Sequence, residues 1–183
     1  CYFQIGNYSE CAEILEKWHA RQGGAKAAGA CCRYIGISYL SLQRWSEASR
    51  WLQLAVVYDE VDAESLSLLG ALYLKLGEGN DIALRLTEKA VEIDGVEPLL
   101  LLRWGRSLTA CGHYRQAIEQ FRRCAAVRQT KIEAWFELGN AYQLQGNHAK
   151  ARRYFKKLVI GREVPEELRL RARALIQENE ITR

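Results

Sequence analysis

Residues 135–155 read WFELGNAYQLQGNHAKARRYF. The positions that define the pattern are Trp135, Leu138, Gly139, Tyr142, Ala151 and Phe155. Their intervals of three, four and one residues place them on helix faces. Small residues at Gly139 and Ala151 let two helix backbones approach closely, while the large residues fill the space between neighbouring helices. The stretch therefore predicts closely packed helices.

The same pattern recurs along the chain with a period of 34 or 35 residues. Glycines stand at Gly36, Gly70, Gly105 and Gly139, and alanines at Ala48, Ala83, Ala117 and Ala151. Two markers that advance in the same step indicate a repeated supersecondary unit. The chain is therefore expected to be an array of similar units.

The order W-x2-L-G-x2-Y followed by A-x3-F resembles the tetratricopeptide repeat (TPR) family. The resemblance implies an all-α fold, a right-handed superhelix of antiparallel helix pairs. It divides the chain into a partial repeat at 1–28 (second helix and connector), full repeats at 29–62, 63–97, 98–131 and 132–165, and a capping helix at 166–183. One additional residue in the turn 77–80 distinguishes the repeat at 63–97.

The two ends of the array differ. Tyr2, Gly6, Tyr8, Cys11 and Leu15 match the later part of a repeat, and the surplus residues before the next copy fit the Gln22, Gly23, Gly24 loop. The chain thus begins inside a repeat and is expected to be a fragment. At the other end, Pro165 followed by two glutamates predicts a helix start. The apolar positions Leu168, Ala172, Leu175 and Ile176 of that helix are suited to cap a solenoid.

Composition favours a helical array without a membrane span. The chain contains two prolines, 49% hydrophobic and 26% charged residues. Its apolar runs are far shorter than the roughly 18 to 20 residues that cross a bilayer. No linker-like stretch divides the sequence, which predicts one continuous solenoid.

Cysteines and histidines show no metal-binding or catalytic spacing. The six cysteines form no Cys-x-x-Cys, and the three histidines form no paired motif. The cysteines are expected to be buried, reduced thiols, so a cytoplasmic setting is predicted, for a fragment from which a targeting signal could be missing. The adjacent Cys31 and Cys32 are the pair to test for a redox role. No cofactor, metal or enzymatic activity is expected.

A second stripe on each first helix is the candidate binding surface. The TPR resemblance implies that it lines a concave groove. With its flanks, the stripe comprises Arg33, Ile37, Leu40, Ser67, Ala71, Leu74, Lys75, Leu102, Arg103, Arg106, Thr109, Phe136, Asn140 and Gln143. A recurring apolar strip indicates a contact site. The alternative is that these positions are solvated or pack the superhelix.

The stripe also predicts the kind of partner. TPR proteins that bind chaperone tails use a Lys and Asn pair at two stripe positions, and none of the corresponding pairs here matches. Apolar pockets with nearby arginines instead suit an extended or helical segment with hydrophobic anchors and acidic flanks. The expected function is a protein-interaction scaffold or adaptor.

Charge suggests two alternative functions. Residues 1–97 carry a net charge of −5 and residues 98–183 one of +9. Oppositely charged halves would allow head-to-tail self-assembly. The basic cluster, Arg122, Arg123, Lys150, Arg152, Arg153, Lys156 and Lys157 with Arg169, Arg171 and Arg173 beyond it, would suit nucleic acid or an anionic membrane surface. Because no aromatic platform is evident among these residues, a solvated face is favoured and nucleic acid is not the expected partner.

Overall fold

The computed structural model describes residues 7–20 and 25–181. Every regular element in that part of the chain is an α-helix, which confirms the predicted all-α class. The predictions made for Tyr2 and Gly6 and for residues 22–24 lie outside the described residues.

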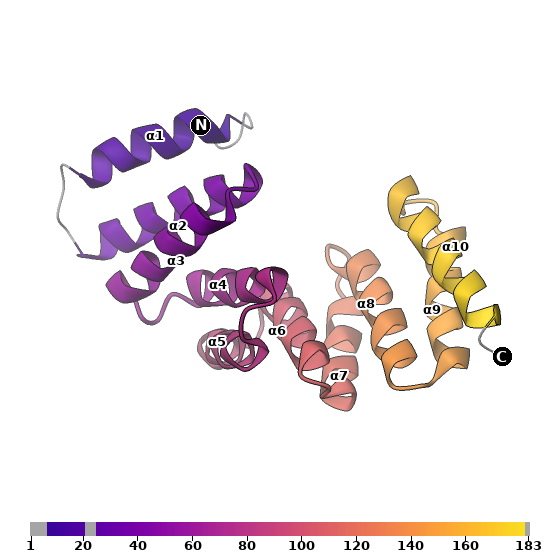
Figure 1. Ribbon diagram of the computed structural model, residues 1–183. Helices are drawn as coiled ribbons and strands as arrows, with labels where there is room; N and C mark the ends of the chain where they lie inside the picture. The colour runs from indigo at the N-terminus through magenta and orange to yellow at the C-terminus, as the bar shows by residue number, and fades with distance from the viewer. Residues whose placement is uncertain (1–6, 21–24, 182–183) are drawn as a thin grey trace. The chain divides into compact units, whose positions relative to one another are not determined.

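The chain divides into two compact units, Cys1–Gly95 and Val96–Arg183, although the sequence predicts one continuous array. The first contains α1 (Tyr8–His19), α2 (Ala25–Ser41), α3 (Trp45–Tyr58), α4 (Ala63–Leu76) and α5 (Asn80–Ile93), shown in Figure 1. The second contains α6 (Pro98–Ala110), α7 (Tyr114–Ala125), α8 (Lys131–Leu144), α9 (His148–Ile160) and α10 (Glu166–Ile181).

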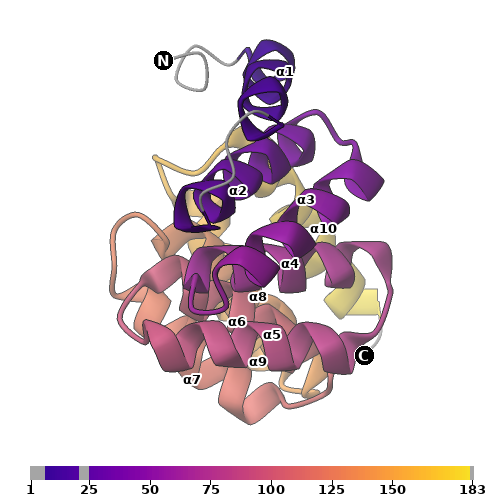
Figure 2. The same cartoon turned by 90° about the vertical axis from the view of Figure 1, so that its left-hand side faces the viewer.

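Within each unit, helices pack chiefly against their neighbours in sequence. In the first unit α1 contacts α2, α2 contacts α3, and the chain continues through α4 to α5; both views show α2 beside α3 (Figure 2). In the second unit contacts run from α6 through α9 to α10, with an additional contact between α6 and α8. Nearest-neighbour packing is the arrangement of repeat proteins.

The repeat glycines lie where a second-helix side chain fills the space of a Cβ. An added Cβ at Gly36 would lie 2.8 Å from Leu52 Cγ, and one at Gly70 would lie 2.7 Å from Thr87 Cγ2. At Gly105 and Gly139 the added atom would collide with a phenylalanine ring. The predicted close approach of two helices at each glycine is therefore confirmed.

The turns between paired helices use a left-handed residue seven positions after the repeat glycine. Gly77, Gly112 and Gly146 have φ values of 71°, 80° and 83°, and Gln43 has φ 58° at the corresponding place between α2 and α3. A side chain disfavours this conformation, whereas glycine adopts it freely. Gln43 is thus the strained member of the series.

The last helix begins where the sequence predicts. It starts at Glu166, directly after Pro165, and carries Glu166 and Glu167 in its first turn. It packs on α9 and buries Ala172 completely, with Leu168, Leu175 and Ile176 partly buried.

Candidate functional site

The stripe residues of the first unit include four apolar side chains on two first helices, here called the α2/α4 patch. It consists of Ile37 and Leu40 on α2 and Ala71 and Leu74 on α4. All four side chains are half-buried. Ile37 and Leu40 also pack against a buried cluster that includes Leu68, Leu69 and Leu72. The patch is therefore a supported surface that can still contact a partner.

Lys75 lies beside the α2/α4 patch and is exposed. Its ammonium is 4.4 Å from the ring centroid of Trp45, the first residue of α3. A cation over an indole face is held by the ring's negative quadrupole. The position gives this edge of the patch a localised positive charge.

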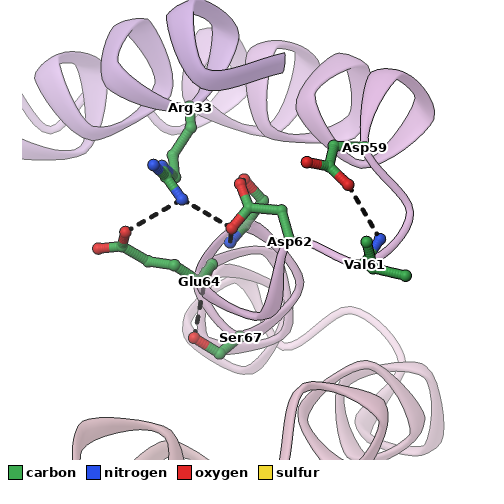
Figure 3. Close-up of polar contacts among 7 residues, drawn as sticks. Arg33, Asp59, Val61, Asp62, Glu64 and Ser67 are labelled. Carbon is green, nitrogen blue, oxygen red and sulfur yellow. Dashed lines mark hydrogen bonds and ion pairs between the residues drawn. The ribbon is translucent and has the colours of Figure 1, made fainter. Parts of the chain in front are cut away.

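Arg33 bonds to carboxylates inside the unit rather than pointing toward an open groove (Figure 3). Its Nη1 is 2.7 Å from Asp62 Oδ1 and 3.3 Å from Glu64 Oε2. Asp62 also caps α4, because it accepts hydrogen bonds from the backbone N–H and the hydroxyl of Ser65. Arg33 thus connects α2 to the start of α4, and its predicted place in the binding groove stays a prediction.

Ser67 and Leu102 are also removed from an accessible stripe. Ser67 is fully buried, and its hydroxyl donates to the backbone carbonyl of Glu64 (Figure 3). Leu102 on α6 is 1% exposed. Spacing placed both residues on the stripe, but their burial supports the packing interpretation at these two positions.

Arg106 makes an equivalent connection inside the second unit. Its Nε is 2.7 Å from Glu137 Oε1 and its Nη2 is 3.2 Å from Glu133 Oε2, so α6 is joined to α8. Desolvation lowers the pKa of Arg106, but the two carboxylates outweigh it and the pKa lies above its ordinary value. Arg106 is thus engaged in an internal ion pair, and its predicted contact with an acidic partner stays a prediction.

The remaining stripe residues of the second unit are mostly engaged as well. Phe136 lies 6.2 Å from Phe155 between ring centroids, and the guanidinium of Arg171 on α10 is 4.9 Å from its ring. Thr109 donates its hydroxyl to the carbonyl of Gly105. Arg103, Asn140 and Gln143 are half-buried. The stripe therefore contributes two separate sets of residues, one in each unit, with apolar contact surface mainly in the first.

A sequence signal for the internal arginine pairs existed. Arg33 and Glu64 are 31 residues apart, as are Arg106 and Glu137. In an array with a period near 34 residues, two residues separated by nearly one period lie at similar places on consecutive first helices. An arginine and a glutamate at this separation can therefore face each other. That comparison would have assigned both arginines to packing.

The basic cluster differs from its prediction because aromatic rings do lie among its cations. Lys157 Nζ is 4.8 Å from the Tyr154 ring centroid and 5.4 Å from that of Trp135, and Lys150 Nζ is 5.3 Å from the Tyr142 ring. These rings come from α8 and α9, two different helices of one repeat. Sequence proximity alone does not reveal that they converge.

Metal ligands do not gather within residues 7–20 and 25–181: no three His, Cys, Asp or Glu side chains there lie close enough to hold an ion. None of the described helices combines the length and apolarity needed to cross a membrane. The described cysteines are free, and Cys31 and Cys32 are both buried in α2.

Comparison with known proteins identifies the repeat. The model of the tetratricopeptide repeat family matches residues 132–160. Human protein O-mannosyl-transferase TMTC1 is 22% identical over 161 residues, which are 85% of this chain but 18% of TMTC1, so the chain spans less than a fifth of that relative.

Two solved structures are similar to most of the chain. YrrB, titled a TPR protein with an unusual peptide-binding site, aligns with a TM-score of 0.71 and 19% identity over 94% of this chain and 87% of YrrB. MamA AMB-1 aligns with a TM-score of 0.69 and 22% identity over 85% and 90% of the two chains. The chain therefore carries a tetratricopeptide repeat at residues 132–160 and has the fold of TPR solenoid proteins.

Proposed function

We propose that this chain is a protein-interaction module, a scaffold or adaptor without catalytic activity, that binds a partner segment on the α2/α4 patch. The observation that carries the proposal is the set of four half-exposed apolar side chains on the first helices of two consecutive repeats. The peptide-binding site named for YrrB supports the idea that this fold holds peptides.

The partner's chemistry follows from the patch and its edge. Ile37, Leu40 and Leu74 suit one or two apolar anchors of an extended or helical segment. Lys75 favours an acidic residue in the partner beside those anchors. Arg33 and Arg106 already pair with carboxylates of the chain, so Lys75 is the cation that supplies this preference. Such a segment buries on the order of 600 to 800 Å² on each side and binds with roughly micromolar affinity.

We also propose a reducing, cytoplasmic setting. Cys32 and Cys124 are fully buried and occupy helix faces as small apolar side chains. This use of cysteine is typical of proteins in reducing compartments.

The test uses a patch variant and a control of the same chemistry. Leu40→Gln with Leu74→Gln makes the patch polar, while Val57→Gln with Ile82→Gln changes two exposed apolar residues on α3 and α5. Phe136 and Arg106 are unsuitable probes because both make contacts inside the protein.

Proteins captured by the full-length parent are identified, and their binding to both variants is measured by calorimetry, with circular dichroism to verify folding. We expect the patch variant to lose affinity by about tenfold or more, which corresponds to about 1.4 kcal/mol, and the control to bind like the parent. Equal affinity of parent and patch variant would show that the partner binds elsewhere.

A further inference from the structure

A pocket in the second unit is lined by cations and tyrosines and contains no acidic residue. Its volume is about 180 Å³, and its walls are Arg122, Tyr142, Lys150, Arg153, Tyr154 and Lys157. These residues come from α7, α8 and α9, which pack consecutively within one unit. Residues up to 35 positions apart in sequence, Arg122 and Lys157, thus converge on one small space.

The cations are held by aromatic groups. Arg122 Nη2 donates to the Tyr142 hydroxyl at 2.7 Å. Lys150 lies over the Tyr142 ring, and Lys157 lies over the Tyr154 ring. The two tyrosine rings stack at 5.8 Å between centroids with a 14° angle between their planes. This arrangement fixes the positions of three charges around the opening before any ligand arrives.

No described carboxylate pairs with the cations that line the pocket. Among the described residues, the ion pairs involve other arginines, and none joins Arg122, Lys150, Arg153 or Lys157 to a carboxylate. Four cations around one pocket repel one another, and a multiply charged anion relieves that repulsion. A phosphoryl group, with nearly two negative charges and three acceptor oxygens, suits two guanidinium groups and two ammonium groups better than a carboxylate does.

The aromatic residues favour a compact phosphoryl group over single-stranded nucleic acid. Binding of unpaired bases requires open ring faces on which the bases stack. Tyr142 is 3% exposed, the two tyrosines occupy each other's faces, and lysines approach both rings. The rings therefore act as walls that position cations and leave little surface for a base.

We propose that this pocket binds the phosphoryl group of a phosphorylated segment of a partner protein. The site is distinct from the α2/α4 patch, so this proposal does not depend on where the first partner binds. It would let phosphorylation of a partner control attachment to the scaffold.

The experiment compares three forms of the full chain. The pocket variant is Lys150→Gln, Arg153→Gln and Lys157→Gln. The charge-matched control is Lys156→Gln, Arg162→Gln and Arg173→Gln, three exposed cations outside the pocket. Because the triple change removes three cation–π contacts, Arg153→Gln alone serves as a milder variant, and circular dichroism establishes that each form is folded.

The probe is a fluorescein-labelled neutral peptide, glycine and serine only, with one central phosphoserine; its unphosphorylated form and an oligothymidylate are compared by anisotropy. We expect the parent and the control to bind the phosphopeptide but neither the unphosphorylated peptide nor the oligothymidylate. The affinity for the phosphopeptide should fall about tenfold or more in the pocket variant and several-fold in Arg153→Gln. Equal losses in control and pocket variant would reduce the effect to nonspecific charge and overturn the proposal. Tighter binding of oligothymidylate than of phosphopeptide, or no binding of the phosphopeptide, would also overturn it.

Discussion

Gly139→Ala tests whether the repeat glycine is required by the ring that packs on it. An added Cβ would lie 2.7 Å from both Cδ1 and Cζ of Phe155. Phe155 is fully buried and has Phe136 beside it, so its ring has little room to move. Overpacking of this kind costs about 1 to 3 kcal/mol. Replacing glycine inside a helix returns about 1 kcal/mol of helix propensity. The net change in the free energy of unfolding is a loss of up to about 2 kcal/mol.

A double-mutant cycle separates the collision from the propensity. Phe155→Leu places at this pair the residue that faces Gly36 in the first unit, where an aliphatic chain can change rotamer. Gly139→Ala should then cost less, or stabilise, in the Phe155→Leu background. The gain in helix propensity from Gly139→Ala is the same in the parent and in the Phe155→Leu background, so it cancels in the cycle. The coupling free energy between the two substitutions therefore measures only the clash of the added Cβ with the Phe155 ring, and it is expected to exceed about 1 kcal/mol.

The four proteins are compared by urea unfolding followed by circular dichroism at 222 nm, a wavelength chosen because every described element is helical. If Gly139→Ala changes the free energy of unfolding equally in both backgrounds, within about 0.5 kcal/mol, the ring does not impose the glycine. The glycine of the repeat pattern would then need another explanation.

Gln43→Gly should stabilise the protein by about 0.5 to 1 kcal/mol, since it removes a side chain from φ 58°; thermal unfolding measures it, and a gain of equal size from Leu42→Gly would refute the backbone argument. Burial raises the pKa of Cys32 and of Cys124 to about 11, above the 9.0 of a free thiol. The folded state therefore holds these protons more tightly, and the stability they contribute below pH 9 should be lost as pH rises from 9 to 11. Urea midpoints across that range should fall less steeply for Cys32→Ala with Cys124→Ala; identical slopes would contradict the assignment.

The periodic part of the fold could be predicted because glycine and its packing partner belong to one repeat. The interval from Gly139 to Phe155 is local, and the same interval recurs at Gly36 and Leu52, so the sequence alone shows which helices pair. The division into two units at Gly95 has no comparable signal, since no linker composition marks it.

The candidate surface was harder to predict because it depends on what the next repeat places opposite each residue. Helical spacing identifies a face of α2, but whether Arg33 points to solvent is decided by Asp62, which caps α4, and by Glu64 in the first turn of α4. Phe136 likewise loses its exposure to Arg171, a residue 35 positions later on α10. Exposure is a property of neighbouring repeats and is only partly encoded in a single one.

The arginine connections from α2 to α4 and from α6 to α8 also determine how each unit responds to bending. An array held only by apolar packing between neighbouring helices bends when those helices slide past one another. An ion pair that joins alternate helices opposes this sliding. These ion pairs are partly exposed, with 19% of the Arg33 side chain and 40% of the Arg106 side chain accessible, so dissolved ions weaken them. The stiffness of each unit, and not only its stability, is therefore set in part by ionic strength.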